Sequence, residues 1–340
     1  MRAEHGFTVV LITRGRPAML RECLASVLAS GGKPEIIAGV NGTDPESLEV
    51  INSFGGAVTA VSLARMCRGE ARNALAALAR GRWLCFLDDD TVVPAGYFVR
   101  LRALIQAYPG TAVFGGGQTL ARRAGGFEAA VYSLLASPWG GGPFTARFSP
   151  AAGTGSAGPE KFILCNLVLD GEFLDSRGLA FEGHLTSAEE NLLLSRMHKA
   201  GARMVLSGDL NLVHRRRGQP GTFVSQVFSC GRGRAQMTVL SPKSSAVFTL
   251  LPPAALLFAL WAAFSAAGIL RLGAAGYFLV SLVAAAFSGA RAAVKPVVFV
   301  LFPVLHISYA AGWVYGLCEG VLEKLSGRFT PRRCCCEEKL

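Results

Sequence analysis

Charged residues almost vanish from the C-terminal part of this chain. Within residues 246–320 the charged side chains are Arg271, Arg291, Lys295 and Glu319. Water-soluble domains carry far more charge than this, and apolar runs of about 20 residues are long enough to span a bilayer as helices. We therefore expect membrane helices in this region, preceded by a water-soluble domain.

Three apolar segments divide this region: 247–270, 273–290 and 296–318. Basic residues follow them in the tail, and positively charged flanks favour the cytosolic side of a membrane. Since the domain before the segments should also be cytosolic, an even number of crossings is expected. We predict a hairpin of two transmembrane helices over 247–290, with the third segment interfacial or re-entrant.

The predicted organisation has three parts. A soluble domain occupies 1–240, a membrane region 246–320, and a basic, cysteine-rich cytosolic tail 321–340. This arrangement makes the protein a multi-pass protein of the inner (cytoplasmic) membrane with its soluble domain in the cytosol. The nine cysteines include no CxxC pair, so we expect reduced thiols rather than zinc sites. The cysteine run at 334–336 raises the possibility of acylation, but we favour a plain cysteine-rich tail.

The soluble part alternates apolar strands with helical patterns. Strands are predicted at 7–13, 34–40, 57–63 and 83–89. This alternation indicates an α/β fold with a mostly parallel sheet that is covered on both faces. In such sheets ligands bind beyond the carboxyl ends of the strands. The polar segments that fall there are Thr13 to Arg16, Asn41 to Asp44 and Asp88 to Asp90.

The second half of the soluble part is less regular. Glycine and proline are frequent in residues 110–160, which we expect to form loops and short strands over the site. A further strand is predicted at 162–169. The segment after it is typical of a helix that is opened by Ser187, carries carboxylates in its first turn and is closed by Gly201.

Three consecutive aspartates, Asp88, Asp89 and Asp90, lie at the end of the predicted strand at 83–89 and directly after it. Adjacent carboxylates repel one another unless a cation or several hydrogen-bond donors neutralise them. A divalent metal ion with oxygen ligands supplies this charge and can hold a diphosphate on its other side. The alternative is a turn in which the aspartates cap a helix near Val93.

Three segments, in this order, resemble the family 2 glycosyltransferases of the GT-A fold. VVLITRGRPAMLRECLASVL resembles the opening strand and helix of that family, GEARNALAALARGRWLCFLDDDTVVP its central stretch, and SAEENLLLSRMHKAG its catalytic helix. The resemblance covers roughly residues 7–236. It implies a Rossmann-like nucleotide-diphospho-sugar transferase domain, followed here by C-terminal transmembrane helices. It also implies Mg2+ or Mn2+ as the cofactor and a nucleotide sugar as the donor.

The resemblance also implies roles for individual residues. Asp88 and Asp90 match the DxD motif, which contacts the ribose and holds the metal ion against the diphosphate. Glu190 matches the base that deprotonates the acceptor hydroxyl for a single displacement with inversion at the anomeric carbon, a role that suits a positioned carboxylate. The further residues with an implied nucleotide or diphosphate contact are Thr13, Arg14, Arg16, Arg72, Asn73 and Asp89.

Two positions depart from the family pattern. The family usually has an aspartate at the end of the second strand for base recognition, whereas this chain has Val40 there, with Asn41 or Asp44 as the nearest alternatives. The catalytic pair is Glu189 and Glu190 rather than Glu and Asp, so its second side chain is one methylene longer. A purely structural role also stays open for the pair, since carboxylates in the first turn of a helix stabilise it through its dipole.

A basic segment follows the last predicted strand of the soluble domain. His214 lies at its start and is a candidate metal or phosphate ligand, although a lone histidine is more often structural. Arginines 215–217, with Arg232 and Arg234, could clamp the diphosphate, bind lipid phosphate or satisfy the positive-inside bias. Trp139 could stack on a sugar ring, but a buried structural tryptophan is the favoured interpretation.

Taken together, these features predict a membrane-anchored, metal-dependent inverting glycosyltransferase. Its expected partners are a nucleotide-sugar donor, a lipid-linked or glycan acceptor and membrane lipids, in the synthesis of a cell-surface polysaccharide or glycolipid. The alternatives are a polyprenyl-phosphate glycosyl synthase and a non-catalytic membrane adaptor that has kept the fold. The net charge of +11 would suit nucleic acid, but aromatic residues do not interleave with the basic ones, so we expect no nucleic-acid partner.

Overall fold

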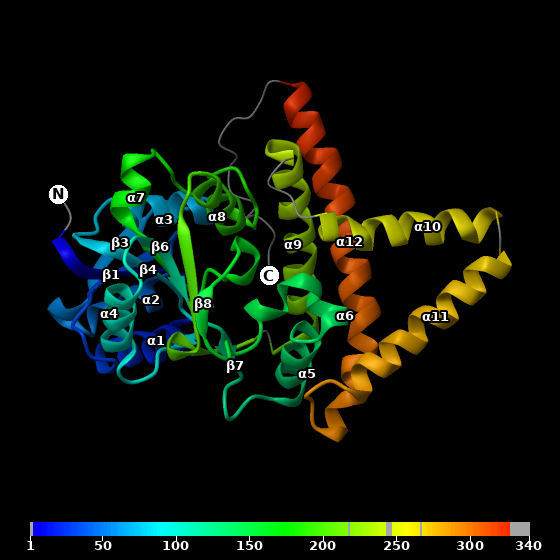
Figure 1. The fold of residues 1–340 in the computed structure, drawn as a ribbon, viewed down its shortest axis with the longest axis horizontal. Helices are drawn as coiled ribbons and strands as arrows, with labels where there is room; N and C mark the ends of the chain where they lie inside the picture. Colours follow the sequence, from blue (N-terminus) through cyan, green and yellow to red (C-terminus); the bar gives the residue numbers. More distant parts are fainter. Residues whose placement is uncertain (1–2, 217, 243–246, 266, 327–340) are drawn as a thin grey trace.

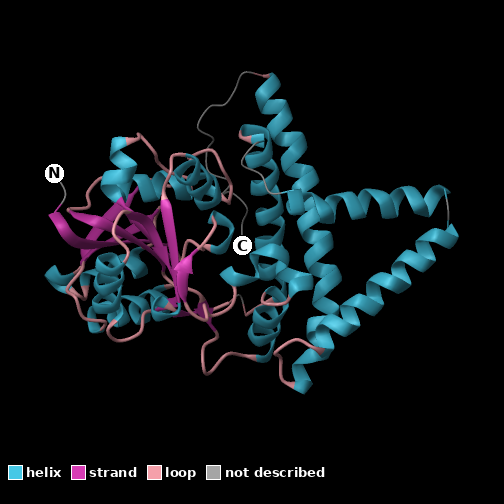
Figure 2. Ribbon diagram, in the orientation of Figure 1, coloured by secondary structure: helices cyan, strands magenta, loops and turns pink. Residues whose placement is uncertain are grey.

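The computed structural model describes residues 3–216, 218–242, 247–265 and 267–326. An α/β unit occupies one side of the molecule, and long C-terminal helices lie beside it (Figure 1). Figure 2 shows that the strands are confined to the α/β unit and that the part beyond it is helical. The predicted Rossmann-like α/β domain is confirmed, and of the predicted C-terminal transmembrane helices one candidate is found among the described residues.

The centre of the α/β unit is a sheet of eight strands, which are β1 (Ala3–Thr13), β2 (Glu35–Asn41), β3 (Thr59–Leu63), β4 (Gly81–Asp88), β6 (Thr111–Gly115), β8 (Thr154–Ser156), β9 (Asn166–Asp170) and β10 (Arg203–Ser207). Their order in the sheet is β3-β2-β1-β4-β9-β6-β10-β8. Strands β1 to β4 pair in parallel, as predicted. Beyond β4 the sheet is mixed, because β9 runs antiparallel to both of its neighbours.

Helices cover both faces of this sheet. They are α1 (Pro17–Ala29), α2 (Pro45–Asn52), α3 (Arg68–Ala76), α4 (Tyr97–Ala107), α7 (Gly171–Ser176) and α8 (Glu189–Lys199). Val9 and Leu11 of β1 belong to the core shared with α1 and α4, whereas Val10 belongs to the core shared with α3 and α8. Successive side chains of a strand point to opposite faces, so a strand buried on both faces is apolar throughout.

A second sheet of three short strands lies at the edge of the α/β unit. Its order is β5 (Thr91–Val92), β11 (Leu212–His214) and β7 (Gln118–Thr119). β11 pairs antiparallel with β5, so that His214 lies opposite Thr91. The backbone N–H of Arg215 also donates to the carbonyl oxygen of Asp90, at 3.0 Å. This sheet therefore brings the start of the basic segment next to the three aspartates.

The region predicted as loops and short strands is partly helical. It contains α5 (Gly126–Leu135), α6 (Pro138–Gly141) and the 3-10 helix η2 (Gly142–Arg147) before β8. The strand predicted at 162–169 begins only at Asn166. Phe162, Leu164 and Cys165 are buried without belonging to that strand. An apolar run predicts that its residues are buried, but buried residues need not belong to a strand.

The opening of the helix that carries the two glutamates also differs from its prediction. The helix begins at Glu189, and Ala188 before it has a left-handed backbone with φ of 68°. Ser187 does not cap it, because its hydroxyl donates instead to the carbonyl oxygen of Ser229, at 2.8 Å. Strained backbone of this kind is held in place by its surroundings and is common at functional sites. Gly201, with φ of 86°, follows the end of the helix as predicted.

Four long helices make up the C-terminal part: α9 (Pro220–Leu240), α10 (Leu251–Ser265), α11 (Ala267–Ala286) and α12 (Lys295–Leu325). Helices α9 and α12 lie side by side, and α10 and α11 project from α12 as a V (Figure 1). α9 was predicted as part of the soluble domain, which ended at residue 240. Because α9 packs along α12, the helix joins the soluble domain to the apolar region.

Glycines allow α9 and α12 to approach closely. A Cβ atom on Gly312 of α12 would overlap the carbonyl oxygen of Phe228, and one on Gly316 would overlap the backbone of Arg232. Gly231 of α9 meets the backbone of α12 at Tyr309 in the same way. Small residues spaced by four are typical of helices that pack backbone to backbone in apolar surroundings.

The predicted multi-pass topology is not supported. Among the described residues, one helix, Ala292–Leu325, is long and apolar enough to cross a bilayer. The apolar helical stretches before it, Val247–Ala259 and Leu270–Ala286, are shorter. The candidate span is therefore the segment that we expected to be interfacial, and the expected hairpin of two spans over 247–290 is not borne out. The cysteine run at 334–336 and Arg217 lie outside the described residues.

Replacement of Gly312 by alanine should destabilise the contact between α9 and α12. Alanine is the better helix former, but its Cβ overlaps the carbonyl oxygen of Phe228. We expect the free energy of unfolding to fall by about 1–3 kcal/mol, measured as a lower Tm of the detergent-solubilised protein. Gly276→Ala in α11, where an added Cβ meets nothing within 4 Å, is the matched control and should not lower the Tm. An equal Tm for the two variants would contradict this account of the packing.

Candidate active site

The carboxyl ends of three neighbouring parallel strands meet at one edge of the sheet. These ends are Thr13 of β1, Asn41 of β2 and Asp88 of β4, as the sequence predicts. A cavity of about 1750 Å³ opens there and extends from the aspartates to the C-terminal helices. The cavity is the candidate active site.

The middle aspartate of the three faces the protein, not the cavity. Asp89 is fully buried, accepts a hydrogen bond from the Thr13 hydroxyl at 2.7 Å and pairs with Arg16. Burial, together with the neighbouring aspartates, raises the pKa of Asp89 to about 7, although Arg16 and Thr13 oppose the shift. Asp89 does not line the cavity. Its side chain therefore anchors the turn, which differs from the nucleotide contact predicted for it.

The outer two aspartates line the cavity. Asp90 pairs with Arg16, and its Oδ1 lies 3.0 Å from Nε2 of His214. Asp88 lies 3.6 Å from a terminal nitrogen of Arg72. The alternative in which the aspartates cap a nearby helix is wrong, because the next helix, α4, begins at Tyr97 after Gly96.

A divalent metal ion fits the donor set at this point. One ligand atom each from Asp88, Cys165 and His214 lies within 4.8 Å of the other two, and Asp90 is hydrogen-bonded to the same histidine. The other ring nitrogen of His214 lies 2.7 Å from Oε1 of Gln118, a contact that orients the ring as in many metal sites. The sequence predicted Asp88, Asp90 and His214 but not Cys165, which sits in an apolar run without any motif.

The two glutamates of α8 have different surroundings. Glu189 is buried and paired with Arg72 at 2.5 Å. Glu190 lines the cavity, accepts a hydrogen bond from the Asn191 amide at 2.6 Å and lies 3.8 Å from Arg147. Burial and the neighbouring Glu189 raise the pKa of Glu190, although Arg147 opposes the shift. Of the two carboxylates, Glu189 is paired with an arginine at 2.5 Å, and Glu190 has no ion pair this close among the described residues.

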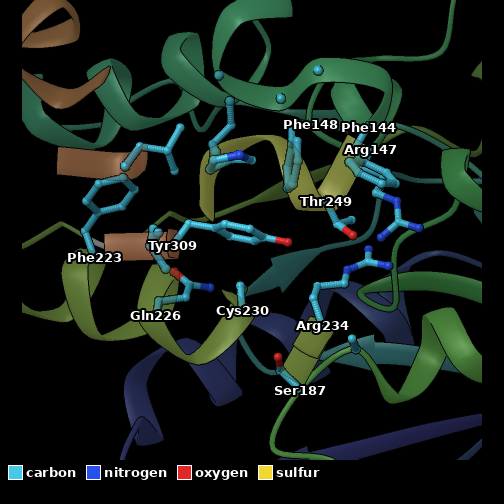
Figure 3. A pocket seen from close by; sticks show the side chains of 18 of the residues that line it. Phe144, Arg147, Phe148, Ser187, Phe223, Gln226, Cys230, Arg234, Thr249 and Tyr309 are labelled. Carbon is cyan, nitrogen blue, oxygen red and sulfur yellow. The ribbon is translucent and has the colours of Figure 1, made fainter. Parts of the chain in front are cut away.

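Two arginines face each other across the cavity beside Glu190. Figure 3 shows the guanidinium groups of Arg147 from η2 and Arg234 from α9 pointing toward one another. Both stack on the ring of Phe144, at 5.1 and 5.0 Å from its centroid. Burial and the charge of Arg234 lower the pKa of Arg147 to about 9. The sequence singled out Arg234 but missed Arg147, since an arginine in a glycine-rich stretch carries no signal of a site.

The remaining predicted nucleotide contacts divide into two groups. Thr13, Arg14, Arg16, Asn41 and Arg72 line the cavity, although the amide of Asn41 is also bonded to the backbone of Met66. Asn73 and Arg232 do not line it. Asn73 bonds the backbone of Phe181 on both sides of its amide. Arg232 forms a bidentate pair with Glu319 at 2.7 and 2.8 Å, which ties α9 to α12. The structure thus places these two side chains in structural contacts rather than at a bound nucleotide.

A smaller cavity of about 650 Å³ adjoins the site at the end of β2. Val40, Asp44 and Arg65 are among its lining residues, and Arg14 and Arg65 line both cavities. Asp44 caps α2 and accepts a hydrogen bond from the backbone N–H of Gly15. These hydrogen bonds lower the pKa of Asp44. Along the chain it is the acidic residue nearest to Val40, the position at which the family pattern has its aspartate.

Trp139 of α6 has a structural partner. Its indole N–H donates to the Ser281 hydroxyl of α11 at 3.0 Å, and its carbonyl oxygen lies 3.0 Å from a ring nitrogen of His306 of α12. The favoured interpretation of a structural tryptophan agrees with these contacts. They fasten the segment that carries Arg147 to the C-terminal helices.

Comparison with known proteins finds a family match over part of the chain and solved structures with a similar fold. Residues 8–122 match the family described as glycosyl transferase family 2. The mannosyltransferase PcManGT from Pyrobaculum calidifontis, in complex with GDP-Man and Mn2+, is similar in structure, with 15% identity, a TM-score of 0.52 and coverage of 95% of this chain and 87% of that one. S. aureus TarS 1-349 in complex with UDP-GlcNAc is also similar, with 13% identity, a TM-score of 0.52 and coverage of 95% and 93%. No curated protein matches the chain in sequence.

Replacement of Cys165 by serine should change the metal preference of the site. A thiolate is a soft ligand, so its loss should weaken Cd2+ binding by about tenfold or more and change Mn2+ binding little. Titration calorimetry of the full-length protein with each metal measures both affinities. Cys318→Ser, at an exposed position on α12, is the control. Unchanged Cd2+ affinity in Cys165→Ser would remove the thiol from the site.

Proposed function

We propose that this chain, whose residues 8–122 match the glycosyl transferase family 2 model and whose fold is similar to that of a mannosyltransferase, is a metal-dependent inverting glycosyltransferase that uses a nucleotide-diphosphate sugar. The observation that carries the proposal is that Glu190 lines the same cavity as Asp88, Asp90 and His214. Cations and carboxylates at the ends of β1 and β4 form one half of the site, and the start of α8 forms the other.

The donor belongs at the strand ends. Arg14, Arg16 and Arg72 line the cavity there and supply positive charge for a diphosphate. Asp88, Asp90 and His214, with Cys165 beside them, are the residues that would hold Mg2+ or Mn2+. A bound ion would neutralise the charge that develops on the leaving diphosphate. The similar structures were solved with GDP-Man and Mn2+ and with UDP-GlcNAc, which supports a nucleotide-sugar donor without choosing its base.

Glu190 is the proposed base. In a single displacement, a bond forms between the acceptor oxygen and the anomeric carbon while the bond from that carbon to the diphosphate oxygen breaks. The electron pair leaves with the nucleoside diphosphate, and the acceptor proton passes to the Glu190 carboxylate. A base needs a pKa closer to neutrality than that of an ordinary glutamate, and burial beside Glu189 raises the pKa of Glu190 in this direction.

The proposed acceptor is a lipid-linked sugar. Helix α12 is long and apolar enough to anchor the enzyme in a bilayer, and the cavity that holds Glu190 continues to apolar residues of α10, α11 and α12. A polyprenyl-phosphate synthase is the second candidate, because the same apolar extension would accept its substrate. In that reaction a phosphate oxygen is the nucleophile, which needs no base.

Replacement of Glu190 by glutamine should lower kcat by roughly 10²–10⁴-fold and change the KM for the sugar nucleotide little. The experiment measures nucleotide release from a panel of sugar nucleotides by full-length protein in membranes, with Mn2+ and a lipid-linked acceptor extract. Glu182→Gln, a glutamate that lies outside the cavity, is the matched control. Full activity of Glu190→Gln would exclude Glu190 as the base and would favour the polyprenyl-phosphate reaction.

The decrease of kcat/KM at acidic pH should follow the protonation of Glu190. Activity requires the ionised carboxylate, so kcat/KM should fall as the pH drops through a pKa that lies above the ordinary value for glutamate. In Glu189→Gln a neighbouring negative charge is lost, and the pKa of Glu190 should therefore decrease. We expect the acidic limb of this variant to move to lower pH. A shift to higher pH would show that another group controls the limb.

A further inference from the structure

The candidate active site continues into an apolar channel. The channel is the part of the 1750 Å³ cavity that lies among the C-terminal helices, and its lining includes Leu251, Leu256, Ala274, Phe278 and Leu305. No acidic residue occurs in the described part of the chain between residues 247 and 318. A hydrocarbon chain could lie in such a channel, whereas a polar glycan would lose its hydrogen bonds with water there.

Arg147 and Arg234 lie between the polar part of the cavity, at the strand ends, and its apolar part, among the C-terminal helices. In Figure 3 the two guanidinium groups point toward each other, and the side chains of Thr249 and Tyr309 lie beside them on the side of the C-terminal helices. Thr249 precedes α10, and Tyr309 belongs to α12. Arg147 also lies 3.8 Å from Glu190, so the two arginines are close both to the proposed base and to the C-terminal helices.

The protein itself neutralises this pair of charges only in part. Arg147 donates to the carbonyl oxygens of Glu160 and Pro159, and Arg234 donates to the side-chain oxygen of Asn191. Among the described residues, the one ion pair that either arginine forms is the 3.8 Å approach of Arg147 to Glu190. Two converging guanidinium groups form a fork of donors that matches a phosphate. An anion bound there would compensate the mutual repulsion of the arginines.

We propose that Arg147 and Arg234 hold the phosphate of a lipid phosphate whose hydrocarbon chain lies in the apolar channel, so that the group attached to this phosphate faces Glu190. This inference rests on the proposed function and specifies its acceptor: an amphipathic lipid with an anionic head, presented from the membrane side. The donor then enters from the strand ends, and the acceptor enters from the opposite side through the channel.

Binding of a short lipid phosphate tests the site without turnover. Full-length protein in detergent is titrated with farnesyl phosphate, with farnesol and with inorganic phosphate. We expect farnesyl phosphate to bind at least about tenfold more tightly than either of the others, because only it satisfies both parts of the site. Equal binding of inorganic phosphate would overturn the proposal in favour of a free-phosphate site, and equal binding of farnesol would overturn the role of the arginines.

Two variants test the phosphate site at the arginines and the apolar channel separately. Arg234→Gln should abolish the advantage of farnesyl phosphate over farnesol, whereas Ala274→Trp, which fills the channel, should abolish its advantage over inorganic phosphate. Arg177→Gln and Leu282→Trp, at exposed positions outside the cavity, are the matched controls and should bind as the wild type does. Arg234 is preferred to Arg147 for the test, since Arg147 also bonds backbone carbonyls.

Nucleotide binding distinguishes failure of this inference from failure of the proposed function. Arg234→Gln should bind UDP and GDP, each with Mn2+, as the wild type does. If this variant lost nucleotide affinity and kept its affinity for farnesyl phosphate, Arg234 would be a diphosphate clamp and the inference would be wrong, although the glycosyltransferase activity would stand. If the wild type turned over no sugar nucleotide but bound farnesyl phosphate as expected, the lipid site would stand and the enzymatic proposal would fail.

Discussion

Charge pairing between carboxylates and arginines is the interaction on which this site depends. Each pair joins different elements: Arg16 after β1 with Asp89 and Asp90, Arg72 of α3 with Asp88 and Glu189, and Arg147 of η2 with Glu190. A buried carboxylate without a partner would take up a proton or destabilise the fold. The pairs therefore fix the strand ends, α3, α8 and η2 relative to one another, and they leave Asp88, Asp90 and His214 at the cavity surface.

The close contact of α9 and α12 completes the site from the other side. Glycines at this contact and the pair of Arg232 with Glu319 bring the two helices together. Arg234 belongs to α9. The packing of α12 against α9 therefore fixes the position of Arg234 at the cavity. The apolar region is thus part of the cavity wall as well as a candidate anchor.

The fold alone does not determine which substrates the protein binds. PcManGT and S. aureus TarS 1-349 share this fold at 15% and 13% identity and were solved with different sugar nucleotides. We propose that the donor is selected at the end of β2, where Val40, Asp44 and Arg65 line the smaller cavity, and that the acceptor is selected at the apolar end of the larger cavity. A functional conclusion therefore has to come from these residues and not from the architecture.

Local patterns of residues were enough to predict strands buried on both faces, aspartates at the end of β4, and an apolar C-terminal region. The sequence could not separate a polar side chain that faces a ligand from one that serves the fold, which is why Asp89, Asn73 and Arg232 turned out to contact the protein. Only the tertiary structure placed Cys165 and Arg147 in the site and made 295–325 the long helix. These are contacts between residues far apart along the chain, and they are set by packing, which periodicity and composition do not encode.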